Sequence, residues 1–232
     1  MLGRRYQLES ELGRGASGAV YRGRDVRSGR LVAVRITRAA AQSGYVVRPY
    51  ARGRDLRPHI GPGRLLPLAT ALAIAARAAD VLAQTHACGA VHGDLSPSNI
   101  VFDRASGTVS LIDPAETPQR GTPAYMSPEQ VRGLPLGPAS DQFSLAAVLY
   151  RLACGRLPFS ASSRPQFAHR IVNEAHTDIR AIDCSLPPAL ASTLDRALAK
   201  RPAARFRSAA AFAAAIRKIA VELPDACPAR IG

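Results

Sequence analysis

Residues 91–100 read VHGDLSPSNI, and this stretch places Asp94 five positions before Asn99. Two short β-type runs follow it, and the second run ends at a further aspartate, Asp113. Asp94, Asn99 and Asp113 are thus polar side chains grouped around one predicted hairpin. A surface loop could supply one such aspartate by chance. Three residues of this chemistry around a predicted hairpin indicate a site instead.

The N-terminal part of the chain contains a second motif. Residues 12–20 read LGRGASGAV, a G-x-G-x-x-G-x-V segment between two predicted strands. Glycines let the backbone approach phosphate oxygens and offer amide donors without side-chain bulk. A strand rather than a helix follows, so the segment is not the dinucleotide-binding fingerprint. Taken alone, the segment could equally be a glycine-rich turn.

The apolar pattern divides the chain into a β-rich start and a helical remainder. Short β-type runs alternate with glycine-rich turns over roughly the first fifty residues. From Pro67 onwards, apolar residues recur at spacings of three and four, as they do on one face of a helix. A helix start signal follows at Ser140-Asp141. The most apolar run, 68–83, contains Arg77 and Asp80, so no membrane span is predicted.

The chain is strongly basic, with a formal net charge of +14. Such a charge can favour acidic partners, nucleic acid or anionic lipid. No dense basic run is interleaved with aromatic residues, so scattered, solvated arginine is the simpler interpretation and no nucleic-acid partner is expected. The four cysteines form no C-x-x-C pair, which predicts reduced thiols and a cytoplasmic location.

Residues 91–100 resemble the catalytic loop of protein kinases. Three later segments resemble bacterial Ser/Thr kinases of the eukaryotic-like family: 121–129 (GTPAYMSPE), 141–145 (DQFSL) and 155–159 (GRLPF). The resemblance runs from about Tyr6 to Ala220. It implies an α+β, two-lobed protein-kinase-like fold with a reduced β-rich N-lobe, a mainly helical C-lobe and a tail, at 1–52, 53–220 and 221–232.

The resemblance also implies ATP and Mg²⁺ as cofactors, a protein substrate, and a set of site residues. Asp94 would accept or orient the proton of the substrate hydroxyl, while Asn99 and Asp113 would bind magnesium. Arg205 would form a structural ion pair with Glu129. The nucleotide would contact Gly13, Gly15, Gly18, Val20, Ala33, Arg35, Pro49, Ala51, Asp55 and Val101.

The chain departs from the family pattern at several named positions. Arg35 replaces the lysine that holds the α- and β-phosphates, and arginine is not its simple equivalent. Only residues 39–44 separate two predicted strands, which leaves no room for the regulatory helix with its glutamate. Pro114, Gly93 and Ser96 replace the Phe of D-F-G, the Arg of H-R-D and the catalytic-loop lysine.

These replacements leave three functions open. If each missing cation costs roughly 10²–10³ in rate, two losses reduce a kinase rate of about 1–100 per second to about 10⁻⁶–10⁻² per second. The chain is then a weak, unregulated Ser/Thr kinase, or a pseudokinase that binds nucleotide or a regulatory protein. The H-G-D-L loop also resembles that of small-molecule phosphotransferases.

Some polar side chains have no predicted catalytic role. The hydroxyl residues of the predicted activation segment are interpreted as turn or cap residues, with autophosphorylation as the alternative: Thr117, Thr122 and Ser127. The histidines outside the motifs show no matching acidic partner in the sequence and are interpreted as structural: His59, His86, His169 and His176.

Overall fold

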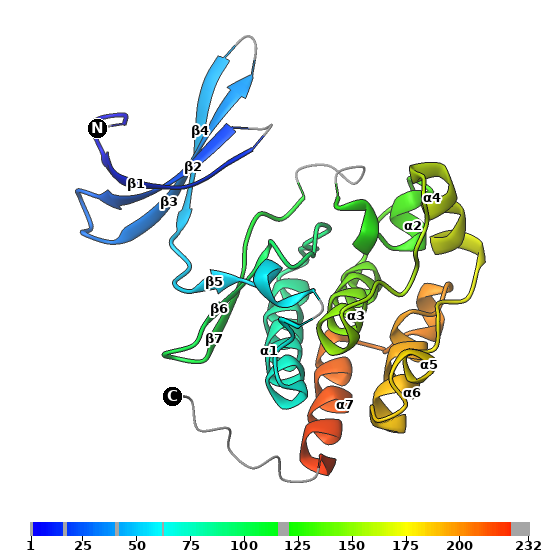
Figure 1. Ribbon diagram of the computed structural model, residues 1–232. Coiled ribbons are helices and arrows are strands. Elements are labelled where there is room, and N and C mark those ends of the chain that lie inside the picture. The colour runs from blue at the N-terminus through cyan, green and yellow to red at the C-terminus, as the bar shows by residue number, and fades with distance from the viewer. Residues whose placement is uncertain (1, 16–17, 40–41, 62, 116–120, 224–232) are drawn as a thin grey trace. The chain divides into compact units, whose positions relative to one another are not determined.

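The computed structural model describes residues 2–15, 18–39, 42–61, 63–115 and 121–223 (Figure 1). The chain forms two compact units, Met1–Arg52 and Gly53–Gly232. The first unit contains a four-stranded sheet, and the second combines a three-stranded sheet with helices. The predicted α+β class is therefore confirmed.

The first unit is an antiparallel sheet in the order β1-β2-β3-β4, with each strand paired to the next in sequence. Its strands are β1 (Tyr6–Gly15), β2 (Gly18–Asp25), β3 (Leu31–Ala39) and β4 (Gln42–Pro49). Side chains alternate between the two faces of a strand. Val32 and Val34 are buried on one face of β3. The register pairs Val20 with Arg35 and Ala33 with Arg48, so these four residues share the opposite face.

Strands β3 and β4 connect directly. Ala39 pairs with Gln42, so only residues 40 and 41, which lie outside the described residues, join the two strands. The sequence predicted a connection over 39–44. That prediction was too long, because both strands extend into the segment. The distance in sequence between the paired residues Ala39 and Gln42 is shorter than the 3.6 residues of one helical turn.

The second unit is mainly helical. Its small sheet has the order β5-β6-β7 and comprises β5 (Arg54–Asp55), β6 (Ile100–Asp103) and β7 (Thr108–Leu111). Its helices are α1 (Leu68–Ala87), α2 (Pro128–Val131), α3 (Pro138–Cys154), α4 (Arg164–Asn173), α5 (Ile179–Ile182), α6 (Pro188–Ala197) and α7 (Ala209–Glu222). Short 3₁₀ turns are η1 (Arg57–His59), η2 (Pro123–Tyr125) and η3 (Pro202–Ala204).

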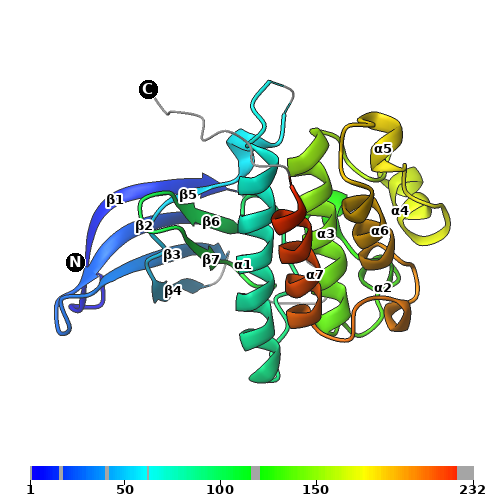
Figure 2. The same ribbon diagram turned by 90° about the horizontal axis from the view of Figure 1, so that it is seen from below.

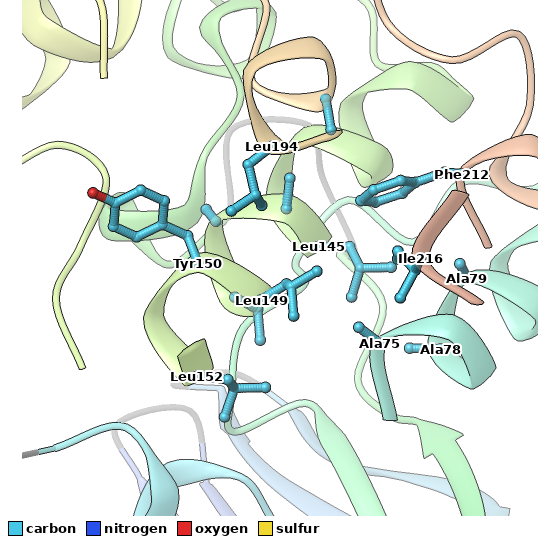
Figure 3. Close-up of a cluster of buried hydrophobic side chains, with 14 of the residues drawn as sticks. Ala75, Ala78, Ala79, Leu145, Leu149, Tyr150, Leu152, Leu194, Phe212 and Ile216 are labelled. Carbon is cyan, nitrogen blue, oxygen red and sulfur yellow. The ribbon is translucent and has the colours of Figure 1, made fainter. Parts of the chain in front are cut away.

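Helices α1, α3 and α7 form the centre of this unit, and α1 packs along both of the others (Figure 2). Small residues on α1 allow the close approach: Ala75, Ala78 and Ala79 face larger side chains of α3 and α7, among them Leu145, Phe212 and Ile216 (Figure 3). By length and composition alone, α1 could cross a membrane. Its apolar face is buried in this core instead, which identifies it as a core helix.

Helix α3 begins earlier than predicted. The sequence signal at Ser140-Asp141 lies inside the first turn, because Pro138 is the first helical residue. The Ser140 hydroxyl accepts a hydrogen bond from the backbone nitrogen of Gly137 at 3.2 Å and so completes this start. Asp141 therefore does not cap α3, and its side chain can bind another part of the chain.

A buried ion pair joins α2 to the segment that precedes α7. Arg205 donates to Glu129 through Nη1 to Oε1 at 2.7 Å and Nη2 to Oε2 at 3.0 Å, which confirms the predicted pair. Ser140 donates a further hydrogen bond to Glu129 at 2.7 Å. Burial by itself would raise the pKa of Glu129, but the bonds and charge of Arg205 hold that pKa below its ordinary value.

We predict that Arg205→Met destabilises the fold by about 3–5 kcal/mol, because it leaves a buried carboxylate unpaired. Urea unfolding at neutral pH measures the loss. The matched control is Arg201→Met, which changes an exposed arginine four positions away. Equal losses in the two variants would contradict a special contribution of the pair.

The same pair predicts a pH dependence of stability. The lowered pKa of Glu129 means that its contribution is present above the ordinary glutamate pKa and is lost as the pH falls through the folded value. In Arg205→Met the buried carboxyl should prefer its proton. Acidification should therefore narrow the stability gap between this variant and the wild type.

Candidate functional site

A loop between α1 and β6 carries Asp94 and Asn99, and a buried carboxylate holds its backbone. Asp141 of α3 accepts hydrogen bonds from the backbone nitrogens of Gly93 at 2.8 Å, through Oδ1, and of His92 at 2.9 Å, through Oδ2. The side chain of Asp141 is only 1% exposed. A satisfied, buried carboxylate therefore fixes the chain immediately before Asp94.

Asp141 has a third partner, and it corrects the interpretation of the histidines. His86 of α1 donates from Nε2 to Oδ2 of Asp141 at 2.8 Å. Two further histidines that were predicted to lack acidic partners also have them: His176 lies 3.1 Å from Asp195, and His169 lies 3.4 Å from Glu174. These partners are brought together by helix packing and turns, which sequence spacing does not reveal.

Gly93 has a backbone conformation that explains its identity. Its φ is +71°, in the left-handed region that glycine tolerates best. A Cβ atom built there would lie 3.1 Å from the Cβ of Ala115 and 3.3 Å from Cδ1 of Leu136. The family's arginine at this position would therefore meet both strain and crowding in this loop. Gln130 donates to the Gly93 carbonyl at 2.8 Å and holds the glycine from its other side.

Asp94 is oriented by two segments of the chain. Its backbone nitrogen donates to Nδ1 of His92 at 3.3 Å. Its carboxylate oxygen Oδ1 accepts from the backbone nitrogen of Thr122 at 3.0 Å and from the Thr122 hydroxyl at 3.2 Å. Burial raises the pKa of Asp94, and the bonds from Thr122 oppose that rise. An oriented carboxylate whose pKa is raised towards neutrality is suited to general-base chemistry.

The same loop fixes the side-chain amide of Asn99. Asn99 donates from Nδ2 to the backbone carbonyl of Asp94 at 2.7 Å, so its carbonyl Oδ1 is the atom suited to a metal. In addition, the backbone nitrogen of Ile112 donates to the backbone carbonyl oxygen of Asn99 at 2.9 Å. This bond brings the end of β7, and with it Asp113, beside Asn99.

Asp113 has an uncommon backbone conformation, with a φ of +53°. Non-glycine residues rarely have a positive φ, and such strain is concentrated at functional sites. Its neighbours are held in place: His92 donates from Nε2 to the carbonyl of Ile112 at 3.0 Å, and Ala115 donates to the carbonyl of His92 at 2.7 Å. Proline at 114 has no N–H to lose in this turn.

The donor set fits magnesium. Mg²⁺ is commonly bound by one or two protein oxygens together with water and substrate phosphates. Asn99 and Asp113 offer one carbonyl and one carboxylate oxygen donor group for that purpose. Within the described ranges, no group of three or more His, Cys, Asp and Glu residues gathers as a metal site. A dedicated zinc or calcium cage is therefore not indicated among those residues. The metal roles of Asn99 and Asp113 stay predictions.

The predicted nucleotide residues of the first unit lie in two places. Gly15 and Gly18 pair across the β1–β2 hairpin, with residues 16 and 17 outside the described residues. Gly18 has a φ of +134°, and a Cβ there would lie 2.0 Å from the Ile36 carbonyl, so the hairpin requires glycine. Gly13 lies on β1. The shared sheet face defined above holds Val20, Ala33 and Arg35.

The remaining residues predicted to bind nucleotide are divided between the two units. Pro49 ends β4 and Ala51 follows it, while Asp55 pairs with Val101 across the sheet of the second unit. Both carboxylate oxygens of Asp55 already accept from Arg57, at 2.9 and 2.8 Å. The predicted ribose contact of Asp55 therefore has an internal competitor. The nucleotide roles of these residues stay predictions.

Thr122 is the site residue that the sequence did not reveal. It precedes η2 as a cap residue would, yet its hydroxyl bonds Asp94 rather than the turn. Ser127, in contrast, is a true cap: its hydroxyl accepts from the backbone nitrogen of Gln130 at 3.3 Å at the start of α2. Thr117 lies outside the described residues. No pattern in the sequence pairs Thr122 with an aspartate 28 positions before it.

The loop geometry agrees with comparisons between this chain and known proteins. The family model described as "Protein kinase domain" matches residues 37–215. The chain belongs to the protein kinase family. The resemblance predicted from the catalytic loop is thereby confirmed, and the α+β fold described above is that of a protein kinase domain.

The relatives are bacterial kinases. The chain is 33% identical to the DNA damage-responsive serine/threonine-protein kinase RqkA of Deinococcus radiodurans, over 92% of the chain and 39% of the relative. It is 35% identical to the serine/threonine-protein kinase PkaB of Streptomyces coelicolor, over 79% of the chain and 47% of the relative. It is 28% identical to the serine/threonine-protein kinase pkn3 of Myxococcus xanthus, over 93% of the chain and 50% of the relative.

The chain is shorter than these relatives, both as a whole and within the matched region. The chain spans half or less of the length of each of these relatives. The alignment with RqkA covers 261 positions, which is more than the 232 residues of the whole chain. That relative therefore has residues inside the matched region that this chain lacks. The two-residue connection between β3 and β4 fits such a shortened kinase domain.

We predict that Thr122→Val raises the pKa of Asp94, because it removes a hydroxyl that bonds the ionised carboxylate. Carbon-13 NMR of labelled aspartate carboxyls, assigned with Asp94→Asn, measures the titration. Thr122→Ser retains the hydroxyl and is the matched control, with a pKa close to that of the wild type. An unchanged Asp94 titration in Thr122→Val would show that the hydroxyl does not influence the carboxylate.

Proposed function

We propose that this chain transfers the γ-phosphoryl group of ATP to Ser or Thr hydroxyls of a protein, slowly and without control by activation-segment phosphorylation. The observation that carries the proposal is the arrangement around Asp94. A half-buried carboxylate is oriented by Thr122, and the main chain next to it binds Asn99. Membership of the protein kinase family gives this arrangement its chemical meaning.

Each residue has a distinct part in the proposed reaction. Asp94 orients the attacking hydroxyl and receives its proton, a role that its raised pKa favours. Asn99 and Asp113 would hold magnesium, which neutralises charge on the phosphates when bound. The positive φ of Asp113 is a backbone conformation of the kind that is concentrated at functional sites, which supports this role.

The absence of a switch is proposed from Gly93. An arginine at this position usually receives a phosphate on the activation segment, whereas glycine offers no side chain for it. The positive φ and the crowding at Gly93 also disfavour a larger residue in this loop. A loop held by Asp141 and Gln130 needs no phosphate to order it.

A protein substrate is supported by the order of the segment that contains Thr122. Residues 121–129 contact Asp94 at one end and join the buried Arg205 ion pair at the other. Relatives of the chain carry the name serine/threonine-protein kinase. A cytoplasmic location, expected from the cysteine pattern, is part of the same proposal.

We predict that Asp94→Asn abolishes incorporation of labelled phosphate from ATP and Mg²⁺ into a generic basic protein. The wild-type rate should be no greater than about 10⁻² per second, because two cations of the family are missing. The control is Asp195→Asn, which neutralises an exposed aspartate on α6. Label in the wild type that is no greater than in Asp94→Asn would contradict the proposed transfer.

Nucleotide binding separates a slow kinase from a pseudokinase. ATP with Mg²⁺ at a hundred times its Kd should stabilise the chain by about 2.7 kcal/mol, measured as a rise in Tm. Arg35→Gln should reduce this rise if Arg35 binds phosphate, as the resemblance implies. Binding without any transfer, in the assay above, would favour the pseudokinase.

A further inference from the structure

The positive charge of this chain is concentrated in its smaller unit. Residues 1–52 contain eleven arginines and three acidic residues, a net charge of +8 out of the +14 of the whole chain. Sequence spacing spreads these arginines along all four strands. The hydrogen-bond pattern instead gathers five of them at one end of the sheet.

Backbone bonds assemble this end from two segments, the residues before β1 and the turn that joins β2 to β3. Val26 donates to the carbonyl of Arg5 at 2.9 Å, Asp25 donates to the carbonyl of Arg30 at 3.0 Å, and Gly29 donates to Asp25 at 2.7 Å. The guanidinium of Arg24 also donates to the carbonyl of Gly29, at 2.9 Å. We call this region the basic end and define it by Arg4, Arg5, Arg24, Arg27 and Arg30 with Val26.

Two carboxylates reduce the charge of the basic end only in part. Asp25 is buried, and Arg5 binds both of its oxygens, at 3.1 and 2.7 Å. Glu9 is shared by Arg22 and Arg24, at 2.8 and 3.2 Å. The other three arginines, at positions 4, 27 and 30, are exposed and form no ion pair with any described carboxylate. Three cations therefore face water at one end of a small sheet.

An apolar side chain lies among these cations. Val26 is 47% exposed at the turn between β2 and β3, directly before Arg27. An exposed apolar residue flanked by arginines suits the interface of an anionic bilayer, where the cations meet lipid phosphates and the apolar group enters the headgroup region. Tyr6 follows Arg5 in the chain and packs against Tyr45 and Arg5, so its ring is engaged in these contacts rather than presented for stacking on nucleic-acid bases.

We propose that the basic end docks on an anionic phospholipid surface and holds this unit of the chain at a membrane. The turn 26–30 and the segment 2–5 would contact the headgroups together. This inference does not depend on phosphoryl transfer, because it concerns binding by residues outside the candidate site.

Cosedimentation with vesicles tests the proposal on the whole chain. Wild-type protein should bind phosphatidylcholine vesicles that contain phosphatidylserine, bind pure phosphatidylcholine poorly, and dissociate as salt is raised. An arginine beside an anionic membrane contributes about a five-fold factor in binding, so Arg27→Gln with Arg30→Gln should weaken it about twenty-five-fold. Val26→Ser should cause a smaller loss.

The matched control is Arg201→Gln with Arg207→Gln, which removes the same charge from exposed positions in the second unit. Retained binding by this control would support a local patch, while equal weakening of the two double variants would overturn it. Lack of wild-type binding to the anionic vesicles at low salt would also overturn the proposal. So would tighter, Arg27-dependent binding to polyglutamate or duplex DNA, which would assign the patch to an acidic protein or a nucleic acid.

Discussion

The geometry around Asp94 depends on a carboxylate that has no part in the chemistry. Asp141 is buried in the first turn of α3, where an uncompensated charge would be costly. Three donors compensate it, two from the backbone of His92 and Gly93 and one from the ring of His86. Because these donors come from the loop that carries Asp94 and from α1, the folded core determines the position of the loop.

Other contacts of the larger unit also contribute both to its stability and to the geometry of the loop. Alanines on α1 let this helix pack closely against α3 and α7, and the packing brings His86 of α1 within hydrogen-bonding distance of Asp141. The buried pair of Arg205 and Glu129 ties the end of the activation segment to the start of α7. Stability and site geometry therefore rest on overlapping contacts. We expect a substitution in the Asp141 cluster or in the Arg205–Glu129 pair to alter the geometry around Asp94, since the members of a buried polar network depend on one another.

The two units differ in what has been retained. The larger unit contains Asp94, Asn99 and Asp113, to which the proposed function assigns the proton and the metal, and Asp113 has a positive backbone φ. In the smaller unit, β3 and β4 pair up to Ala39 and Gln42 and so follow each other almost directly. Its charge is arranged at the end of the sheet where β2 turns into β3, which is where the proposed membrane contact lies. The small unit is thus an arginine-rich sheet whose surface is available for the proposed contact with lipid.

The sequence by itself determined the protein kinase family, the α+β fold class and the Glu129–Arg205 pair. These features are encoded in local motifs and in apolar periodicity, which one sequence displays directly. Only the tertiary structure decided the partners of Asp141, the bond from Thr122 to Asp94 and the gathering of Arg5 with Val26. Each of these joins residues that are distant in sequence, and packing rather than spacing brings them within hydrogen-bonding reach.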